Sequence, residues 1–403
     1  MMSMMSMTRC ILLLLFFALP LHGQIIGWRT DGTGIYPDAT PPIEWGKQNV
    51  VWSTPLPGRS HAIPVVLGER IFVCSDPSAL MCINTADGSV RWQHELNYAN
   101  VEMPDGTDSK LPPTHGNNGH STPTPVTDGV HVWVLSGIGI AACFDLEGNQ
   151  VWARFIDKPT HEWGHSASPA LIDGVLVVAI RQFHGLDART GKERWSTDSA
   201  LSWGSPTATR VGDEAILLTA HGAAIRVRDG AKIDAQLGKL EYATPVVQDG
   251  IAYYIEGNAV AVKLGPLDGT TLQTEQLWRQ KLKGSRHYAS PVIHDGLIYA
   301  VSDEGKFSIT DAATGEVYDQ RKLDFVSGGN SVYPSVSFAG GHIFMGCQEG
   351  VTVVLEPGKT YKQIARNKTE GYRSTPVFVG NRMYLRTFSH LTCFSSHRAR
   401  PPA

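Results

Sequence analysis

Residues 289–301 read ASPVIHDGLIYAV, and the pattern of this stretch recurs along the chain. A serine and a proline are followed by an Asp-Gly pair and then by a run of aliphatic and aromatic residues. Proline cannot donate to a strand ladder, which favours a place at the start of a strand. The Asp-Gly pair favours a tight turn between two strands. The stretch therefore predicts two short antiparallel strands.

Eight copies of this unit can be aligned by their prolines. The copies are HAIPVVLGERIFV from His61, STPTPVTDGVHVWV from Ser121, SASPALIDGVLVV from Ser166, GSPTATRVGDEAILL from Gly204, ATPVVQDGIAYYI from Ala243, ASPVIHDGLIYAV from Ala289, YPSVSFAGGHIFM from Tyr333 and STPVFVGNRMYL from Ser374. The marker prolines are Pro64, Pro123, Pro169, Pro206, Pro245, Pro291, Pro334 and Pro376. Their period of roughly forty residues is typical of propeller blades. We expect an all-β protein, an eight-bladed β-propeller of four-stranded antiparallel blades.

A tryptophan in the expected fourth strand marks several blades. It follows a glycine by four residues at Trp92, Trp152 and Trp195, and Trp278 holds the place in blade 5 after a longer turn. Blades 4, 6 and 7 lack it. A side chain of this size is expected to cover the gap between neighbouring blades rather than to stack on a cofactor. In the third strands of three blades, one slot holds a cysteine, interpreted as a small buried hydrophobe. These are Cys82, Cys143 and Cys393.

The last blade needs a strand from the other end of the chain. Its repeat ends after a third strand near Ser396, whereas residues 49–56 (NVVWSTPL) resemble a fourth strand with its tryptophan, Trp52. We predict that the strand around Trp52 pairs with the strand containing Leu391 to Phe394, because this removes two exposed sheet edges. The propeller then spans residues 45–396, between a strap at residues 24–44 and a tail at residues 397–403.

The beginning of the chain has the features of a signal peptide, predicted at residues 1–23. Arg9 precedes the apolar run CILLLLFFALPL at residues 10–21, and Gly23 follows at a plausible cleavage point. A membrane anchor is the alternative interpretation. No second apolar run follows, so a periplasmic or secreted bacterial protein without a transmembrane segment in the mature chain is expected. A net charge of -3, with 18% charged residues, indicates no nucleic-acid partner.

Three stretches identify a family resemblance. NTADGSVRW from Asn84, DARTGKERW from Asp187 and DAATGEV from Asp311 resemble the quinoprotein-type, pyrroloquinoline-quinone-like propeller repeat. This repeat occurs in quinone-dependent alcohol dehydrogenases and in the propeller subunit of the outer-membrane β-barrel assembly machinery. GWRTDGTGIYP from Gly27 and VYPSVSFAGGHIF from Val332 are similar to secreted quinoprotein-like propellers of planctomycete-type bacteria. The resemblance implies the fold, but one fold hosts several functions.

For the enzymes of this group, the resemblance implies a disulfide between adjacent cysteines, a stacking tryptophan, a calcium ion and a catalytic aspartate. This sequence has no adjacent cysteines and no Cys-x-x-Cys-His. Nor does it contain a G-x-S-x-G or H-E-x-x-H motif. We therefore predict no catalytic residue, no metal site and no cofactor. Pyrroloquinoline quinone and calcium are expected only if the protein is, as the alternative has it, an oxidoreductase.

The residues that precede the marker prolines are the candidate binding residues. In a four-stranded blade, the loop into the innermost strand opens on one face of the central channel, so these residues converge there. The set is His61, His120, His165, Trp203, Tyr242, His287, Tyr288, Tyr333 and Arg373. Aromatic and basic groups could bind a ligand, or they could simply fill the channel mouth. The polar loop from Asn97 to Gly119 is expected on the same face.

Together these features favour an exported, monomeric propeller that acts as a binding scaffold in the cell envelope, without catalysis of its own. Its partner is expected to be an envelope protein or an extracellular ligand at the channel face. The main alternative is a quinone-dependent oxidoreductase. A weaker third possibility, a carbohydrate-related binding or processing protein, rests only on the aromatic residues of the channel mouth.

Overall fold

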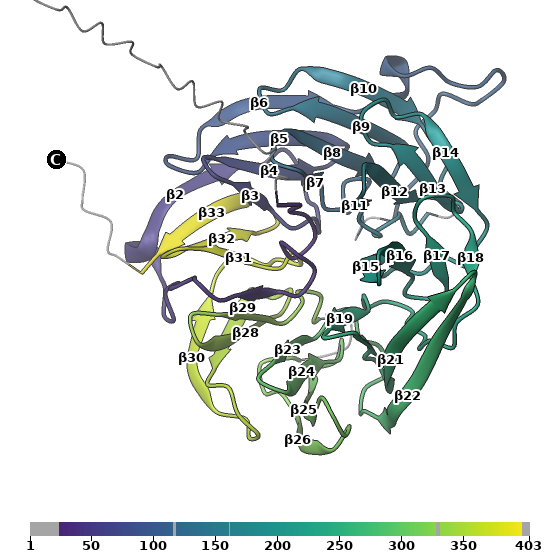
Figure 1. Ribbon diagram of the computed structural model, residues 1–403. Helices are drawn as coiled ribbons and strands as arrows, with labels where there is room; N and C mark the ends of the chain where they lie inside the picture. Colours follow the sequence, from purple (N-terminus) through teal and green to yellow (C-terminus); the bar gives the residue numbers. More distant parts are fainter. Residues whose placement is uncertain (1–23, 116–117, 161, 328–330, 397–403) are drawn as a thin grey trace, which may run out of the picture.

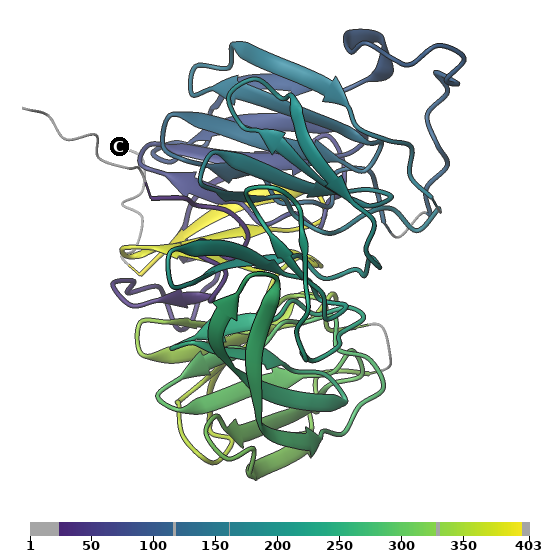
Figure 2. The same cartoon turned by 45° about the vertical axis from the view of Figure 1, so that its right-hand side comes forward.

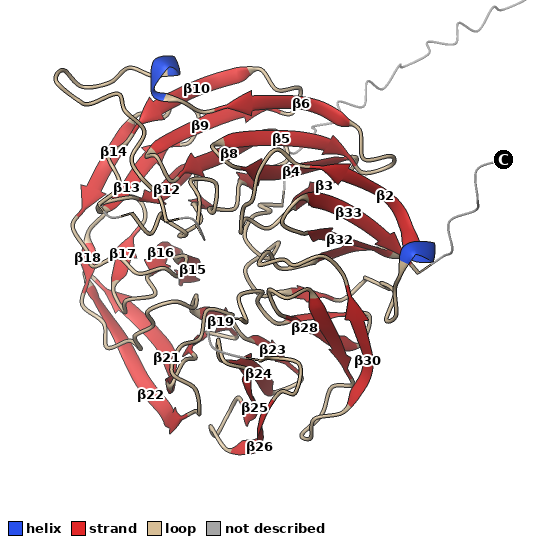
Figure 3. Ribbon diagram, turned by 180° about the vertical axis from the view of Figure 1, so that it is seen from behind, coloured by secondary structure: helices blue, strands red, loops and turns tan. Residues whose placement is uncertain are grey.

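The computed structural model describes residues 24–115, 118–160, 162–327 and 331–396. The predicted signal peptide and the predicted C-terminal tail lie outside these residues. Within them, eight four-stranded antiparallel blades stand around a central channel (Figure 1), and two short 3-10 helices lie at the outer edge of the ring, η1 (Lys47–Asn49) and η2 (Tyr98–Asn100) (Figure 3). The predicted eight-bladed propeller of four-stranded blades is confirmed.

Each blade runs from an innermost strand at the channel to an outermost strand at the outer edge of the propeller. Blades 1 to 4 contain β3 (Val65–Leu67), β4 (Arg70–Ser75), β5 (Ala79–Asn84) and β6 (Val90–Glu95); β7 (Val126–Thr127), β8 (His131–Ser136), β9 (Ile140–Asp145) and β10 (Gln150–Phe155); β11 (Ala170–Ile172), β12 (Val175–Ala179), β13 (Phe183–Asp187) and β14 (Glu193–Thr197); and β15 (Thr207–Val211), β16 (Glu214–Leu218), β17 (Ala224–Arg226) and β18 (Lys232–Ile233).

The second half of the ring repeats this order. Blades 5 to 8 contain β19 (Val246–Gln248), β20 (Ile251–Tyr254), β21 (Asn258–Asp268) and β22 (Thr271–Lys281); β23 (Val292–His294), β24 (Leu297–Val301), β25 (Lys306–Asp311) and β26 (Val317–Lys322); β27 (Ser337–Ala339), β28 (His342–Gly346), β29 (Val351–Leu355) and β30 (Gln363–Lys368); and β31 (Val377–Val379), β32 (Arg382–Arg386), β33 (His390–Ser395) and β2 (Val50–Pro55).

The repeat register differs from the sequence alignment in two blades. Six marker prolines directly precede an innermost strand, but Pro123 and Pro334 do not. In blade 2 the strand follows Pro125, and in blade 7 it follows Val336. Pro125 and Val336 each lie two residues after the marker proline of their blade. The alignment on marker prolines was therefore wrong by two residues in these blades. We call the position directly before each innermost strand the proline slot.

The ring closes through the N-terminal strand, as predicted. β2 pairs antiparallel with β33, with Trp52 opposite Cys393 and Thr54 opposite Leu391. The last blade thus takes its outermost strand from the start of the propeller (Figure 1). This pairing covers the outer edge of β33, which would otherwise present free backbone groups to solvent.

Tryptophans join five pairs of neighbouring blades. In each, the indole N–H of one blade donates to a backbone carbonyl of the next, at N···O distances of 2.7–3.1 Å. The pairs are Trp52 with Thr85, Trp92 with Leu146, Trp152 with Ala188, Trp195 with Val227 and Trp278 with Ala312. The cross-strand neighbours of these tryptophans are small: Cys393, Cys82, Cys143, Gly185 and Ala261. The structural role expected for the tryptophans is confirmed.

Other segments cover two of the three joints that lack this tryptophan. Between blades 4 and 5, the long hairpin β21–β22 reaches the short outer strand of blade 4, where Asp234 and Leu272 share a backbone hydrogen bond of 2.9 Å. Between blades 6 and 7, the amide of Tyr361 donates to Asp319 at 2.8 Å, and the Tyr361 ring lies against Phe307. Insertions in the following blade therefore replace the missing indole.

The N-terminal segment covers the third joint, between blades 7 and 8. Trp45 is buried, with its ring 6.4 Å from Phe344 of blade 7 and 6.1 Å from Phe394 of blade 8. Its amide donates to the side chain of Asn367 at 2.9 Å. The strand β1 (Ile35–Tyr36) pairs parallel with β27, the innermost strand of blade 7. The segment before β2 is thus packed into the propeller.

Candidate functional site

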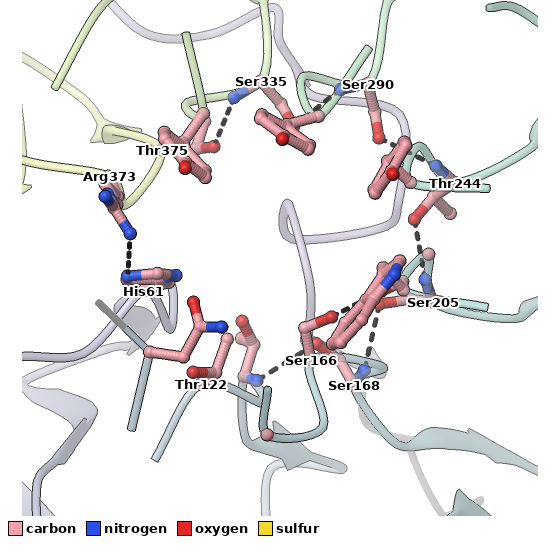
Figure 4. A pocket seen from close by; sticks show the side chains of 18 of the residues that line it. His61, Thr122, Ser166, Ser168, Ser205, Thr244, Ser290, Ser335, Arg373 and Thr375 are labelled. Carbon is pink, nitrogen blue, oxygen red and sulfur yellow. Dashed lines mark hydrogen bonds between the residues drawn. The ribbon is translucent and has the colours of Figure 1, made fainter. Parts of the chain in front are cut away.

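A cavity of about 860 Å³ lies on the channel axis and is lined by every blade. The segments that lead into the innermost strands supply most of its wall (Figure 4). Along these extended segments, alternate side chains point the same way. The first and third residues before the proline slot consequently face the cavity, and they form two rings, one of hydroxyls and one of larger side chains.

The hydroxyl ring consists of serines and threonines directly before the proline slot. In each case the backbone N–H of one blade donates to the side-chain oxygen of the next, at 2.9–3.1 Å. The acceptors are Thr124, Ser168, Ser205, Thr244, Ser290, Ser335 and Thr375. Blade 1 has Ile63 at this position. Seven of the eight joints are thus linked at the channel by the same bond, most of which can be followed in Figure 4.

The rim ring consists of the third residue before each proline slot. Its eight members all line the cavity: His61, Thr122, Ser166, Trp203, Tyr242, Tyr288, Tyr333 and Arg373. Six of them were among the residues predicted from the sequence. Thr122 and Ser166 were not. The structure therefore brings the larger part of the predicted set together at one mouth of the channel.

The side chains of blades 5 to 8 form a continuous wall in this ring. The rings of Tyr242 and Tyr288 meet edge to face, with centroids 4.9 Å apart, and Tyr288 stacks on Tyr333 at 4.7 Å. The guanidinium of Arg373 lies 4.0 Å above the Tyr333 ring. Edge-to-face and stacked rings of this kind hold one another in place. The wall is therefore fixed by its own contacts.

Arg373 is held in one orientation by its hydrogen bonds. Nε and one terminal nitrogen donate to the Gln348 side chain at 3.0 and 2.9 Å, and the other terminal nitrogen lies 3.3 Å from Nε2 of His61 (Figure 4). Burial lowers the pKa of Arg373, while the nearby Tyr333 acts in the opposite direction. A guanidinium stays protonated at neutral pH even so. Arg373 therefore brings a positive charge, with a fixed direction, to the cavity wall.

Two half-buried carboxylates hold the loops behind the rim ring. Asp76 accepts hydrogen bonds from the amides of His120 and Ser121, each at 3.1 Å. Glu256 accepts from the amides of Tyr242 and Ala243, each at 2.8 Å. Burial raises the pKa of both carboxyl groups, against the lowering effect of these hydrogen bonds. The two side chains position backbone that carries rim residues and do not line the cavity themselves.

Three predicted histidines lie behind the rim ring. His165 is one residue before Ser166 and still lines the cavity, whereas His120 and His287 are not among the described lining residues. His120 was chosen from the misaligned Pro123, and His287 lies next to Tyr288 with its side chain on the other side of the segment. Burial lowers the pKa of both, to about 4 for His287. These two residues belong to the packing behind the cavity.

Sequence reasoning missed several further residues of the cavity lining. Arg59, Arg286, Gln348 and Phe388 also line the cavity. Arg59 and Arg286 lie two residues before His61 and Tyr288, so the same alternation along the chain could have found them. Gln348 and Phe388 come from loops between the second and third strands, where the repeat has no marker residue. Thr122 would have followed from an alignment on Pro125. Ser166 is the third residue before Pro169, which was already a marker proline, but the neighbouring His165 was chosen in its place.

The N-terminal segment forms part of the cavity lining. A tight hairpin links Gly27 and Thr30 by two backbone hydrogen bonds of 2.8 and 3.0 Å, with Trp28 and Arg29 at its tip. Trp28 lines the cavity. Ile26 forms a bridge with Thr127 of blade 2, on the innermost strand. The hairpin therefore lies within the channel, joined at this point to blade 2.

Arg29 anchors the hairpin to the opposite side of the channel. Its side chain is fully buried and donates to the carbonyl of Pro291 at 2.8 Å and to that of Val336 at 2.6 Å. Burial lowers the pKa of Arg29 to about 10. Gly34 passes so close that a Cβ atom there would lie 2.0 Å from the guanidinium. Trp28 is thus held in the channel by bonds to blades 2, 6 and 7.

The predicted polar loop also reaches the cavity. After η2 it projects from the ring and returns to the mouth of the channel (Figure 2). His115 stacks on Trp163 at a centroid distance of 4.3 Å, and the Asn118 side chain donates to the Trp163 carbonyl at 2.5 Å. His115, Asn118 and Trp163 all line the cavity. The loop therefore lies on the face where it was expected.

The described residues do not fit a quinone held with calcium. Calcium requires several oxygen ligands, usually including carboxylates. Glu241 is the sole carboxylate among the described lining residues, and in that part of the chain no three His, Cys, Asp or Glu side chains are grouped to hold a metal ion. The five cysteines that the structure covers are free and buried. No reaction step is therefore assigned to a quinone, and it remains a prediction that the protein binds neither quinone nor calcium.

None of the helices in the described residues is long and apolar enough to cross a membrane.

Comparison with known proteins gives one family and several similar folds. The family model described as outer membrane protein assembly factor BamB matches residues 46–139 and 137–400. No curated protein matches the chain. Similar solved structures include BamB from Moraxella catarrhalis, which is 15% identical, with a TM-score of 0.62 over 86% of this chain and 99% of that chain.

Two dehydrogenases show the same architecture. The quinohemoprotein alcohol dehydrogenase from Comamonas testosteroni is 13% identical, with a TM-score of 0.60 over 88% of this chain and 78% of that chain. A europium-containing methanol dehydrogenase is 12% identical, with a TM-score of 0.59 over 89% of this chain and 88% of that chain. At such identities the likeness concerns the fold alone.

Proposed function

The chain belongs to the family of the outer membrane protein assembly factor BamB, and on that premise we propose that it is a binding scaffold of the bacterial cell envelope. It takes its partner at the face of the propeller where the cavity opens, and it carries out no chemistry of its own. The family description concerns protein assembly. The predicted signal peptide agrees with an envelope location.

The composition of the cavity mouth carries this proposal. Trp203, Tyr242, Tyr288 and Tyr333 line it together with Arg373. Tryptophan, tyrosine and arginine are the residues most enriched at binding hot spots, because they offer a large contact area and directed hydrogen bonds. Their rigid placement lowers the entropic cost of binding. The mouth therefore has the side chains of a recognition site on a preformed frame.

Site-specific photo-crosslinking in the host envelope tests the proposal. The photoreactive p-benzoylphenylalanine replaces Thr122 at the rim or, as the matched control, the exposed Val151 on the outer strand β10. We expect a discrete protein adduct from position 122 and none from position 151. The additional substitutions Trp203→Ala and Arg373→Ala should weaken that adduct. Equal adducts at both positions, or none at position 122, would contradict a partner at the cavity face.

A further inference from the structure

Three arginines and one carboxylate are among the described residues that line the cavity. Arg59, Arg286 and Arg373 line it, and the first two are exposed. Arg286 Nη1 lies 3.3 Å from the Tyr288 hydroxyl, and the guanidinium of Arg59 lies 4.8 Å above the Phe388 ring. Among the described lining residues Glu241 is the one carboxylate. A concave surface of one charge attracts ligands of the opposite charge. The cavity therefore favours an anion.

Three aromatic side chains of the mouth have one face covered by a neighbouring group. Tyr288 and Tyr333 stack on each other, and Arg373 lies over Tyr333. Trp163 is stacked on His115. A sugar ring stacks on a free aromatic face, and the covered faces of these three side chains are not available to it. Guanidinium groups and hydroxyls suit the planar oxygens of a carboxylate. This geometry favours a carboxylate over a neutral sugar.

The N-terminal hairpin limits how a chain can enter. Trp28 lines the cavity, and Arg29 ties the hairpin to the carbonyls of Pro291 and Val336 within the channel. A long polymer passing along the channel axis would meet this hairpin. A chain end can instead enter from the mouth and stop there. The volume of about 860 Å³ lies within the range of roughly 300–1,000 Å³ that is usual for small-ligand sites.

We propose that the cavity binds the C-terminal carboxylate of an acidic peptide segment on the partner protein. This inference rests on the proposed scaffold function and specifies what the scaffold recognises. Arg59 and Arg286 attract the acidic segment at the mouth, and Arg373 supplies a fixed guanidinium inside it. The hydroxyls of Tyr242 and Tyr288 complete the polar surroundings. Capture of a terminal carboxylate is an established mode of peptide recognition.

Fluorescence anisotropy with defined peptides tests the proposal on the full mature chain. The probe is a fluorescein-labelled Gly-Ser-Asp-Glu-Asp-Phe peptide with a free C-terminus. The comparison probes are its C-terminal amide and a version with Asn and Gln in place of Asp and Glu. We expect saturable binding of the probe and a loss of about fivefold or more for either change. Raising NaCl from about 50 to about 300 mM should also weaken binding.

Substitutions at the mouth locate the site. Arg59→Gln and Arg286→Gln should each weaken binding of the acidic peptide by about fivefold, which corresponds to roughly 1 kcal/mol. Both side chains are exposed, so the melting temperature should stay near that of the unchanged protein. The matched control is Arg279→Gln, an exposed arginine on the outer strand β22, which should leave binding unchanged.

Three results would overturn the inference. One is equal binding of the acidic, amidated and neutral peptides, and another is no binding of any of them. The third is arginine-dependent binding of an oligogalacturonate in place of the peptides, which would make the ligand an acidic carbohydrate. If the peptides fail while the position-122 adduct persists, the scaffold function stands and only the ligand class is wrong. If neither peptide binding nor the position-122 adduct is observed, the proposed ligand and the proposed scaffold function are both wrong.

Discussion

At the scale of single residues, one hydroxyl in each of seven blades links the blades at the channel. The backbone N–H that leads into an innermost strand lacks a neighbouring strand on the channel side. A serine or threonine of the next blade accepts from it, as Ser205 does from Ser168 at 3.0 Å. Buried N–H groups almost always find such a partner, because leaving one unpaired is costly. The hydroxyl ring therefore joins the blades where the cavity begins.

Removing one of these hydroxyls should destabilise the propeller. Ser205→Ala leaves the buried amide of Ser168 without its acceptor, so we expect a loss of about 1–3 kcal/mol in the free energy of unfolding. Urea denaturation followed by tryptophan fluorescence measures it. The control is Ser196→Ala on the outer strand β14, where the serine is exposed and a change within about 0.5 kcal/mol is expected. Equal effects of both substitutions would show that the ring contributes nothing.

The buried His287 should make stability depend on pH. Burial lowers its pKa from 6.5 to about 4, while Asp303 acts against this. Between these two values the unfolded chain binds more protons than the folded chain. Stability therefore falls as the pH drops from about 6.5 to about 4, and the contribution is absent above that window. The full effect is roughly 3 kcal/mol.

The substitution His287→Asn isolates this contribution. Unfolding free energies of both proteins are measured from pH 7 to pH 4, and their difference is followed. Burial raises the pKa of Asp76 and Glu256, whose contributions have the opposite sign, but these groups are present in both proteins. The variant should lose less stability than the unchanged protein over this range. Parallel curves would show that His287 does not titrate in this way.

At the scale of elements, tryptophan and glycine pair across the joints between blades. The Trp195 ring of blade 3 lies on the turn of blade 4, where a Cβ at Gly230 would come within 2.6 Å of the indole. Gly230 also has a φ of 72°, a conformation that glycine adopts with little strain. The side-chain hydroxyl of Thr197 donates to the Gly230 carbonyl at 2.6 Å. Outer strand and neighbouring turn thus fit as one unit.

Trp195→Ala should open this joint. The substitution removes a buried indole and its hydrogen bond to Val227, so we expect a loss of about 3–5 kcal/mol. Differential scanning calorimetry measures the effect. The control is Trp163→Ala, because this tryptophan is 48% exposed and lies on a loop. A loss at Trp163 as large as that at Trp195 would contradict the assigned roles.

At the scale of the whole molecule, the propeller is a closed frame around the cavity on the channel axis. The outermost strand of the eighth blade, β2, comes from the N-terminal part of the chain, and the N-terminal hairpin lies in the channel. Segments from the two ends are thus bound to one ring. The dehydrogenases that share the architecture show how the same frame occurs in enzymes. One frame can host several functions, and in this chain the proposed function rests on the residues that line the cavity.

We expect the mature protein to bind no pyrroloquinoline quinone. The lining has one described carboxylate and no described group of metal ligands, so calcium and quinone lack their usual donors. Equilibrium dialysis with quinone and calcium, read by absorbance, should leave no stoichiometric quinone on the protein. A dye-linked assay with alcohols should stay at background. Stoichiometric uptake together with substrate oxidation would establish the oxidoreductase alternative instead.

Local patterns of the chain were sufficient for the architecture. The repeat at Pro291, the tryptophan after the glycine turn of several blades and the strand around Trp52 predicted eight blades and their closure. Each of these features acts over a few residues or between neighbouring blades, so its meaning can be read from the residues alone. The same logic placed six of the eight rim residues, because side chains alternate along an extended segment.

Tertiary structure alone decided what fills the channel and which side chains face it. Arg29 bonds to carbonyls 262 and 307 residues away, and no local pattern indicates such partners. A shift of two residues at Pro123 was enough to select His120 in place of Thr122. Which residues of a short segment face the cavity is set by its hydrogen bond to the neighbouring blade. In blade 2 this is the bond from the Thr124 amide to the Ser168 side chain. Long-range contacts, unlike the repeat, leave no periodic trace in the sequence.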